Sequence, residues 1–488
     1  MYRVSVVGLG KLGQCLAATL ALRGFDTLGV DIDSRIVQSI NNGQATVIEP
    51  GLQEIITRVG RKLKATQSHA EAILETDITC ILVATPSEPE GNFSNRHLEA
   101  AFHSLAESLG KSSKRYHLFM IHSTVMPGAI EGYLIPLIEK VSGKRLNQDF
   151  GVCYCPELVA LGNVIQDFLR PDLVMIGQSD DFAGDQAIRI YNQLTENSPP
   201  IFRMSIPNAE IAKISLNCYI TLKIGFANTL ANLCECIPGG DVDTVTQVLG
   251  ADRRISPYYL RGGLAYGGTC FPRDTSAFVA LARRYGYEAE LVQAAERINH
   301  LQNEHLCRLV YGALAGIGGR EVSILGLAFK PNTPVITESP AIKLIEMLLK
   351  SRVEIYVFDP QAMEETKRIF GNQIHYCQSA EQCLGHSPVC VLVTPWKEFQ
   401  SIEALDSSPN PLIFIDCWRF FNPSKLSSRT LYVPWGRHQS HRYGEAGPAK
   451  IIRFKGPTRP RIQALPHSSK AITRHRSDGA KLKTEKRS

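Results

Sequence analysis

The sequence has no apolar run of the roughly 20 residues that a membrane-spanning helix needs. It has no pair of cysteines spaced as CxxC, although 13 cysteines are present, an odd number. Its 13 histidines show no spacing typical of metal ligands. We therefore expect a protein without a transmembrane segment, with reduced thiols in place of a disulfide framework, and without a bound metal.

The first residues already carry a structural signal. The short apolar stretch Tyr2–Val7 predicts a β-strand, so we expect no signal peptide and a cytoplasmic protein. The length of 488 residues indicates two to four domains. We expect no nucleic-acid partner.

The glycine loop after this strand is typical of dinucleotide binding. Residues 8–13 read Gly-Leu-Gly-Lys-Leu-Gly and open an apolar helix that we expect to reach Leu22. The first glycine allows the tight turn, the second admits a pyrophosphate, and the third lets helix and strand pack closely. A second strand, 27–30, ends on Asp31, where a carboxylate binds a ribose and repels a 2′-phosphate. The pattern predicts NAD in preference to NADP.

Residues 267–274, Gly-Gly-Thr-Cys-Phe-Pro-Arg-Asp, hold the most informative thiol. Cys270 lies four residues before Asp274 and just after a glycine pair that lets a substrate approach the backbone. A thiol placed in this way can attack an aldehyde and hold the product as a thioester, so that one chain oxidises an alcohol to an acid. A structural cysteine in a glycine turn is the alternative that this segment alone leaves open.

A second series of strands and helices follows in the C-terminal half. Strands are expected at 322–325, 353–358, 389–394 and 412–416, with a helix at 339–351. This alternation predicts a second parallel α/β domain. Its loop at Gly326 lacks the full glycine triplet, so we expect it to bind a nucleotide in another manner.

Between the two α/β units the sequence predicts a long helix, from Ser205 towards Cys236, and a further helix capped by Asp241. Lys213 and Asn217 share one face of the long helix because they are four residues apart. A cation beside an amide can stabilise an oxyanion, although this pair alone also fits a solvated helix face.

The end of the chain is strongly basic. Residues 437–488 hold 14 Lys/Arg and three Asp/Glu, a net +11, which leaves about −5 for residues 1–436 because the whole chain is +6. The segment is poor in apolar periodicity and rich in Ser, Pro and Arg, so we expect a disordered tail. It either contacts an acidic surface or only solvates the protein.

Further motifs occur in a fixed order along residues 1–425. They are Glu-Pro-Gly-Leu at 49–52, Val-Ala-Thr-Pro-Ser at 83–87, Ser-Thr-Val-Met-Pro-Gly at 123–128, Cys-Pro-Glu-Leu at 155–158, Arg-Ile-Ser at 254–256, Gly-Leu-Ala-Phe-Lys at 326–330 and Glu-Ser-Pro at 338–340. Together with the glycine loop, Lys213, Asn217 and the Cys270 segment, they make the chain resemble the UDP-glucose/GDP-mannose dehydrogenase family.

This resemblance implies an α/β fold with two Rossmann-like parallel-sheet domains, bridged by a long central helix and a small helical domain. NAD would bind the first domain and a nucleotide sugar the second, and the central helix would form the core of a homodimer or higher homo-oligomer. The expected domains are an NAD-binding domain (1–200), a central helical dimerisation domain with the catalytic cysteine loop (201–300), a UDP-sugar-binding domain (301–436) and the basic tail (437–488).

The resemblance also implies catalytic roles in a four-electron oxidation at C6 of the sugar. Cys270 would be the nucleophile that forms a thiohemiacetal and then a thioester. Lys213 and Asn217 would stabilise oxyanions. Thr124 and Asp274 would position a water molecule, with Asp274 assisting proton transfer, and Glu157 would act on water during thioester hydrolysis.

Binding residues follow from the same resemblance. Arg254 would reach the sugar in a neighbouring subunit, Tyr259 would pack near the sugar, and Lys330 would bind the nucleotide sugar from the second domain. The expected substrate-binding residues are Glu157, Lys213, Asn217, Arg254, Tyr259, Gly267 and Lys330. The expected cofactor-binding residues are Gly8, Gly10, Lys11, Leu12, Gly13, Asp31, Thr85 and Thr124.

The chain departs from the family pattern at two positions. Leu161 stands where many glucose-type members carry a second glutamate, four residues after Glu157, and leucine neither accepts a proton nor hydrogen-bonds. Thr337 stands where an arginine is common, which removes a bidentate donor. Thioester hydrolysis and the cofactor contacts in the cleft are the features that these departures affect.

We expect oxidation of UDP-glucose to UDP-glucuronate, in service of polysaccharide biosynthesis. The alternatives are a UDP-N-acetylhexosamine or another UDP-hexose, and then GDP-mannose. Two other classes remain open: a catalytically weak sugar-nucleotide-binding protein of a polysaccharide assembly, and a two-electron hydroxyacid dehydrogenase of the same fold.

Overall fold

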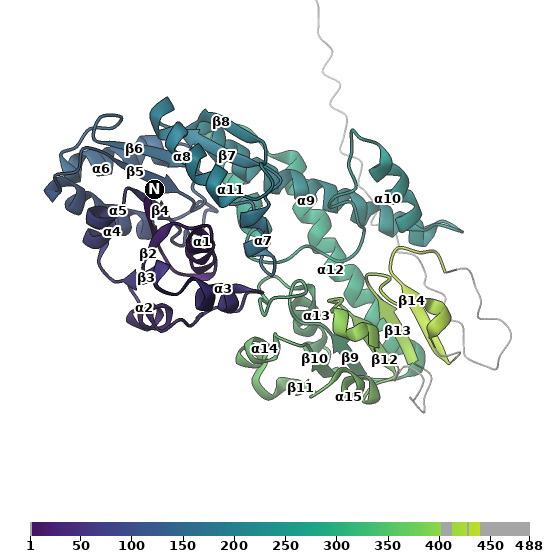
Figure 1. The fold of residues 1–488 in the computed structure, drawn as a ribbon. Helices are drawn as coiled ribbons and strands as arrows, with labels where there is room; N and C mark the ends of the chain where they lie inside the picture. Colours follow the sequence, from purple (N-terminus) through teal and green to yellow (C-terminus); the bar gives the residue numbers. More distant parts are fainter. Residues whose placement is uncertain (1, 402–411, 427–428, 440–488) are drawn as a thin grey trace, which may run out of the picture. The chain divides into compact units, whose positions relative to one another are not determined.

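The computed structural model describes residues 2–401, 412–426 and 429–439 (Figure 1). The expected basic tail lies outside the described residues from position 440 onwards. The described part is an α/β protein with two sheets of mainly parallel strands, as the sequence predicts. None of its helices is both long and apolar enough to cross a bilayer.

The N-terminal sheet has eight strands in the order β3-β2-β1-β4-β5-β6-β7-β8. Neighbouring strands are parallel except β6 and β7, which are antiparallel. The strands are β1 (Arg3–Val7), β2 (Asp26–Val30), β3 (Leu63–Thr66), β4 (Ile78–Ile81), β5 (His117–Ile121), β6 (Phe150–Tyr154), β7 (Val174–Gln178) and β8 (Ile201–Ser205). The strand order reverses direction between β1 and β4, and this is where doubly wound sheets bind ligands, at the carboxyl ends of the strands.

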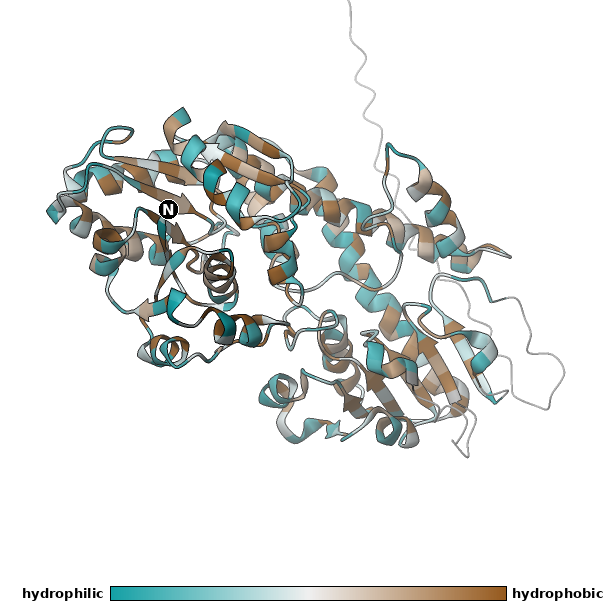
Figure 2. Cartoon of the chain, in the orientation of Figure 1, coloured by the Kyte–Doolittle hydropathy of each residue, from teal (hydrophilic) through white to brown (hydrophobic). Residues whose placement is uncertain are grey.

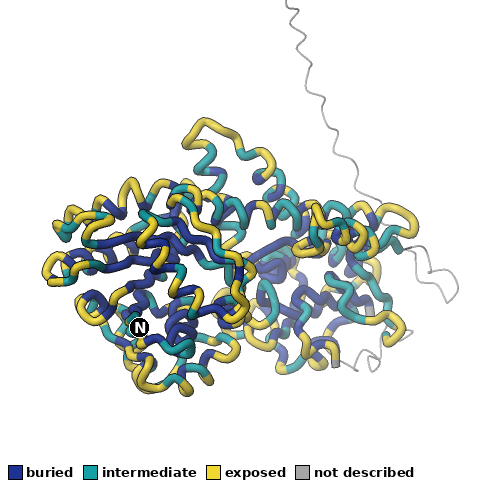
Figure 3. Tube along the Cα trace, turned by 45° about the horizontal axis from the view of Figure 1, so that its top comes forward, coloured by how far each residue is buried: buried dark blue, intermediate teal, exposed yellow. Residues whose placement is uncertain are grey.

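Helices cover both faces of this sheet (Figure 1). One apolar cluster joins Val4 and Val6 to Leu16 of α1, and another joins Val7 to Phe102 of α5. The strands are therefore buried from both sides, as the dark blue interior of Figure 3 shows. The helices are α1 (Lys11–Leu22), α2 (Ser34–Asn41), α3 (Leu52–Val59), α4 (His69–Glu75), α5 (Arg96–Lys111), α6 (Ile135–Ser142), α7 (Val164–Leu169) and α8 (Asp181–Leu194).

The C-terminal sheet is parallel throughout, in the order β11-β10-β9-β12-β13-β14. Its central strands are apolar, and its helices carry one apolar and one polar side (Figure 2). The strands are β9 (Glu321–Leu325), β10 (Glu354–Phe358), β11 (His375–Tyr376), β12 (Val389–Leu392), β13 (Leu412–Asp416) and β14 (Thr430–Pro434), and the helices are α13 (Pro340–Leu349), α14 (Met363–Phe370) and α15 (Ala380–Gly385).

In each sheet an aspartate accepts a hydrogen bond from the loop that follows the first strand in the chain, β1 or β9. Asp31 accepts a hydrogen bond from the backbone N–H of Leu9 at 2.7 Å, and Asp359 accepts one from Leu327 at 2.7 Å. The Asp359 carboxylate is 1 % exposed and receives four more N–H donors from the protein. Because its oxygens are saturated, Asp359 has no acceptor left for a ribose. This supports the expectation that the second domain binds its nucleotide in another manner.

Between the sheets the chain forms α9 (Ile206–Cys236), α10 (Val242–Ala251), α11 (Phe271–Arg284) and α12 (Glu290–Ile317). Two elements lie at the expected domain boundaries. Strand β8 begins just past residue 200 and belongs to the N-terminal sheet, because it pairs with β7. Helix α12 continues past residue 300 and ends at Gly318, which adopts the left-handed conformation.

The first residues of the expected tail are held by the protein. The Arg437 guanidinium pairs with Asp241 at 3.0 Å and with Asp243 at 3.1 Å, both at the start of α10. The folded chain therefore extends past position 437, and residues 440–488 are the part of the predicted tail that lies outside the described residues.

Candidate active site

The glycine loop after β1 has the space that a dinucleotide needs. A Cβ on Gly13 would lie 1.7 Å from the carbonyl oxygen of Gly8, whereas a Cβ on Gly10 would meet nothing within 4 Å. Gly10 is also the N-cap of α1 and supplies no side-chain cap, so the first N–H groups of the helix point into open space. Lys11 and Leu12 provide two of these groups. The residues present therefore fit the pyrophosphate of NAD.

Asp31 lies at the end of β2, where the ribose is expected. Its Oδ2 accepts from Leu9 N at 2.7 Å and its Oδ1 accepts from Asp33 N at 2.9 Å, which fixes the carboxylate at the loop. A fixed negative charge at this point disfavours a 2′-phosphate.

We expect Asp31→Asn to weaken the preference for NAD over NADP by about tenfold, because the amide keeps an acceptor for Leu9 but loses the repulsive charge. The measurement is kcat/KM with each cofactor. Asp26→Asn, at an exposed position of the same strand, is the control and should leave the ratio unchanged.

Cys270 occupies the N-cap position of α11, and its side chain is exposed. The N–H of Asp274 donates to the Cys270 carbonyl at 2.8 Å, which starts the helix. The positive end of the helix dipole therefore lies at Cys270. Cys270 is thus an accessible thiol at a helix N-terminus.

The glycine pair before Cys270 lets this loop press against the C-terminal domain. A Cβ on Gly267 would lie 2.3 Å from the Glu338 carbonyl oxygen. Gly268 has a φ of +85° and donates its N–H to the Thr337 carbonyl at 2.9 Å. Thr337 therefore supports the cysteine loop through its backbone.

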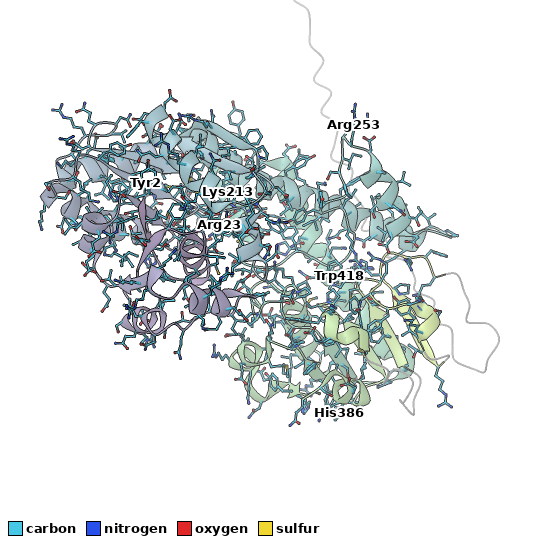
Figure 4. The ribbon with its side chains drawn as sticks, viewed as in Figure 1. Tyr2, Arg23, Lys213, Arg253, His386 and Trp418 are labelled. Carbon is cyan, nitrogen blue, oxygen red and sulfur yellow. The ribbon has the colours of Figure 1, made fainter. Side chains whose placement is uncertain are left out.

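Helix α9 presents Lys213 and Asn217 towards the cysteine loop (Figure 4 labels Lys213). Both residues are buried, at 7 % and 8 % exposure, so the solvated helix face is excluded. Asn217 Nδ2 donates to Asp274 Oδ2 at 2.6 Å. Burial lowers the pKa of Lys213 below its usual value, and the nearby Asp274 and Cys270 oppose this effect. The structure thus brings together four of the predicted catalytic residues.

Asp274 is fully buried, and its charge is balanced by its neighbour Arg273. The Arg273 Nη2 lies 2.9 Å from Asp274 Oδ1, and its guanidinium stacks over Phe93 at 4.8 Å. With Asn217 on the other oxygen, the carboxylate is held in one orientation. Sequence analysis assigned no role to Arg273, although it lies within the cysteine segment.

Two further segments join the site from the N-terminal sheet. Thr85 Oγ1, after β4, donates to the Thr124 carbonyl at 2.7 Å, after β5. The carbonyl of Glu157, after β6, accepts from Lys213 Nζ at 2.7 Å. These residues follow consecutive parallel strands, so their side chains gather at one edge of the sheet. The side chain of Glu157 contacts His122, which the sequence analysis did not identify.

The second domain contributes Lys330. Burial lowers its pKa, and the negative charges of Asp167, Glu49 and Cys270 oppose this effect. Tyr259 is half exposed, and its ring meets the edge of Phe271, next to Cys270, at 6.3 Å.

Arg254 stands apart from this cluster within the chain. It is exposed and pairs with Asp252 at 2.6 Å, so its expected role in a neighbouring subunit stays a prediction. Among the described residues, no three His, Cys, Asp or Glu side chains gather as they would around a metal ion.

One departure from the family pattern, Leu161, lies beside the glycine loop, whereas the other, Thr337, lies at the cysteine loop. Leu161 lines a cavity of about 210 Å³ together with Lys11, Glu49 and Thr333. Leu161 also packs against the apolar core of the N-terminal domain. Glu49 accepts from the N–H groups of Gly162 and Val164 at 2.9 and 2.8 Å, which explains the Glu-Pro-Gly-Leu motif as a support for this loop.

Comparison with known proteins follows the same division of the chain. Three models of the UDP-glucose/GDP-mannose dehydrogenase family match: the NAD binding domain at residues 2–195, the central domain at 207–301 and the UDP binding domain at 323–423. The chain belongs to this family. The predicted family, the nucleotide-sugar 6-dehydrogenase class and the NAD-binding domain are confirmed.

Individual members of the family show how far the similarity extends. The chain is 37 % identical over 416 residues to the UDP-glucose 6-dehydrogenase AglM of Haloferax volcanii, covering 85 % of this chain and 96 % of that one. It is 34 % identical over 381 residues to the GDP-mannose 6-dehydrogenase of Pseudomonas savastanoi pv. phaseolicola, covering 77 % and 84 %. The structure of a UDP-glucose dehydrogenase from Pyrobaculum islandicum matches with a TM-score of 0.82 at 30 % identity, covering 90 % of this chain and 98 % of that chain.

Proposed function

We propose that this family member oxidises C6 of UDP-glucose to UDP-glucuronate, in two steps joined by a thioester on Cys270. The observation that carries the proposal is the exposed thiol at the N-terminus of α11, with the buried Lys213 beside it and Asn217 and Asp274 hydrogen-bonded behind it. NAD held by the first domain would accept one hydride in each oxidation, so that two molecules of NAD are consumed per sugar. A thiol has no role in a simple two-electron alcohol oxidation, so its place here favours the four-electron reaction.

Different residues of the site act in the successive steps of the reaction. In the first oxidation C6 loses a hydride and its hydroxyl loses a proton, which Asp274 helps to transfer through a water molecule shared with Thr124. Sγ of Cys270 then adds to the aldehyde carbon, and the carbonyl oxygen takes up the proton that the thiol loses. Lys213 and Asn217 stabilise the oxyanion character at this oxygen.

The thiohemiacetal on Cys270 loses the second hydride and the hydroxyl proton, and a thioester remains. Glu157 takes a proton from the attacking water, the C–S bond breaks, and the acid leaves with the thiol restored. Lys330 holds the nucleotide sugar from the second domain, and Tyr259 packs near the sugar. The thiol has to stay reduced throughout, which supports a cytoplasmic setting.

UDP-glucose is the first choice of substrate because the UDP-binding domain model matches and because AglM and the Pyrobaculum protein carry that activity in their names. GDP-mannose is the second candidate, supported by the 34 % identity to the Pseudomonas enzyme.

The deciding experiment measures NADH formation with UDP-glucose, UDP-GlcNAc, UDP-ManNAc, UDP-galactose and GDP-mannose, together with the mass of each product. Two NADH per UDP-glucose and a product uronic acid are expected. If a different nucleotide sugar gives this result, that sugar is the substrate and the proposed chemistry still holds. No turnover by folded, NAD-binding protein overturns the catalytic proposal and favours a binding protein.

A homodimer built on α9 is the second part of the proposal. The helix face opposite Lys213 carries large exposed apolar side chains at helical spacing: Ile211, Tyr219, Phe226 and Leu233, which are 45 to 64 % exposed. A continuous apolar stripe of this kind typically marks an interface, and a second copy of the same helix can cover it. Arg254 would then lie near a neighbouring subunit.

We expect Phe226→Glu with Leu233→Glu to convert the protein to a monomer, because two charges would be buried in the interface. Light scattering after size-exclusion chromatography measures the mass. Ile369→Glu, at an exposed apolar position on α14, is the control. A double variant that keeps the wild-type mass would contradict this interface.

A further inference from the structure

His122 and Glu157 form a buried pair at the carboxyl edge of the N-terminal sheet. His122 follows β5 directly and Glu157 follows β6, and these strands are parallel neighbours. The Nδ1 of His122 lies 2.5 Å from Oε1 of Glu157. The two side chains are 2 % and 11 % exposed. Such a short, sheltered contact fixes both groups.

The carboxylate of Glu157 depends on this histidine. Among the described residues, His122 is its hydrogen-bond partner, because Lys213 donates to the Glu157 carbonyl and not to the carboxylate. Leu161, where a second carboxylate is common in related enzymes, packs into the apolar core and offers no hydrogen bond. Nothing else described on that loop orients the Glu157 side chain.

The other groups that interact with the pair come from β4, α8, α9 and the loop after β6. Cys80 on β4 interacts with the imidazole. Cys155 directly after β6, Tyr191 on α8 and Lys213 on α9 interact with Glu157. Burial raises the pKa values of Cys155 and Tyr191, so both stay neutral.

The imidazole is positioned to carry a charge. Burial alone would lower the pKa of His122, but Cys80 and Glu157 raise it to about 10. A carboxylate only accepts hydrogen bonds, so Nδ1 of His122 donates to Glu157 and holds its carboxylate in place. The carboxylate is the form of this side chain that accepts a proton from water.

We propose that His122 is a positioning residue that holds the Glu157 carboxylate towards the thioester on Cys270 and so sets the rate of thioester hydrolysis. The inference rests on the proposed function, since it assumes that a thioester forms. His122 itself touches neither substrate nor cofactor in this role. His122 takes the place of the second glutamate as the side chain that orients Glu157, because Leu161 cannot form a hydrogen bond.

The test compares His122→Leu with His122→Asn in the full-length enzyme with UDP-glucose. In His122→Leu both hydride transfers should still occur, giving a burst of two NADH per site, followed by steady turnover about 100-fold slower because the base is misplaced. The acyl-enzyme should then be visible in the intact protein mass. His122→Asn keeps a donor near the position of Nδ1 and should restore much of the rate.

Hydroxylamine provides a readout that a general loss of packing would not change. It attacks thioesters without a protein base, so it should release a hydroxamate and restore turnover in His122→Leu. The double variant His122→Leu/Glu157→Gln should be no slower than Glu157→Gln alone, because both changes remove the same function, the proton transfer from water to Glu157. His103→Leu is the matched control, since His103 forms an exposed pair with Glu107 at 3.7 Å.

Each outcome of these experiments either supports or contradicts the proposed role of His122. A burst, an acyl-enzyme and rescue by hydroxylamine and by asparagine support the role. Wild-type hydrolysis in His122→Leu overturns it, and so does equal slowing of both hydride transfers without an acyl-enzyme. If His122→Leu does not fold, thioester hydrolysis about 100-fold below the wild-type rate in folded His122→Asn overturns the proposed role, because the asparagine donor should restore much of the rate. If the wild type forms neither NADH nor acid from UDP-glucose, the proposed function fails, and not the role of His122.

Discussion

Replacement of Cys270 by serine should abolish formation of the acid while leaving the alcohol–aldehyde step intact. Sγ of Cys270 is the atom that the proposed route bonds to C6, and its exposure at the N-terminus of α11 makes it accessible. A serine hydroxyl in the same place is a far weaker nucleophile. We expect the rate of acid formation to fall by about a thousandfold or more, as for the loss of other catalytic nucleophiles.

The two half-reactions can be measured separately with the C6 aldehyde of UDP-glucose. Wild-type enzyme should oxidise it with NAD and reduce it with NADH, whereas Cys270→Ser should retain only the reduction. Cys236→Ser is the control, because Cys236 is the other exposed cysteine among the described residues. Full turnover by Cys270→Ser would contradict the thioester route and favour a two-electron dehydrogenase.

Features that depend on neighbouring residues were predictable from the sequence. The glycine loop, its strand and its helix lie where the pattern placed them, and Asp31 closes the loop. The predicted strands of the second domain correspond to β9, β10, β12 and β13. Their signals, glycine spacing and apolar runs, are local properties of the chain.

Features that depend on distant residues were not predictable. Lys213 and Asn217 share a face as expected, but their partners, the Glu157 carbonyl and the Asp274 carboxylate, are 56 and 57 residues away. His122 is a single histidine before a Ser-Thr pair, with no spacing that marks it. The only signal is its place at the end of a strand, and it becomes useful once β5 and β6 are known to be parallel neighbours.

Strand β8 was not predicted from the sequence, for a related reason. Strand β8 is held by its pairing with β7, a tertiary contact, and its own residues show no alternation of buried and exposed positions. Tertiary pairing thus overrode a weak local pattern.

Lys213→Met should lower kcat by about 100- to 1000-fold, the usual loss when one oxyanion donor is removed. Methionine keeps the apolar stem of the side chain, so the packing of α9 is preserved while the charge is lost. KM should change little, because the ammonium group acts on charge that develops during the reaction and not on the bound alcohol. Lys140→Met, on an exposed turn of α6, is the control.

The pH dependence of the wild type gives an independent check on the same residue. Burial lowers the pKa of Lys213, so its ammonium form is lost at a lower pH than in an ordinary lysine. We therefore expect kcat to fall on the alkaline side below pH 10.5, the usual lysine value, and we expect this limb to be absent from the residual activity of Lys213→Met. A variant with normal kcat and a raised KM would show that Lys213 only binds the substrate. A retained alkaline limb would assign that titration to another group of the site.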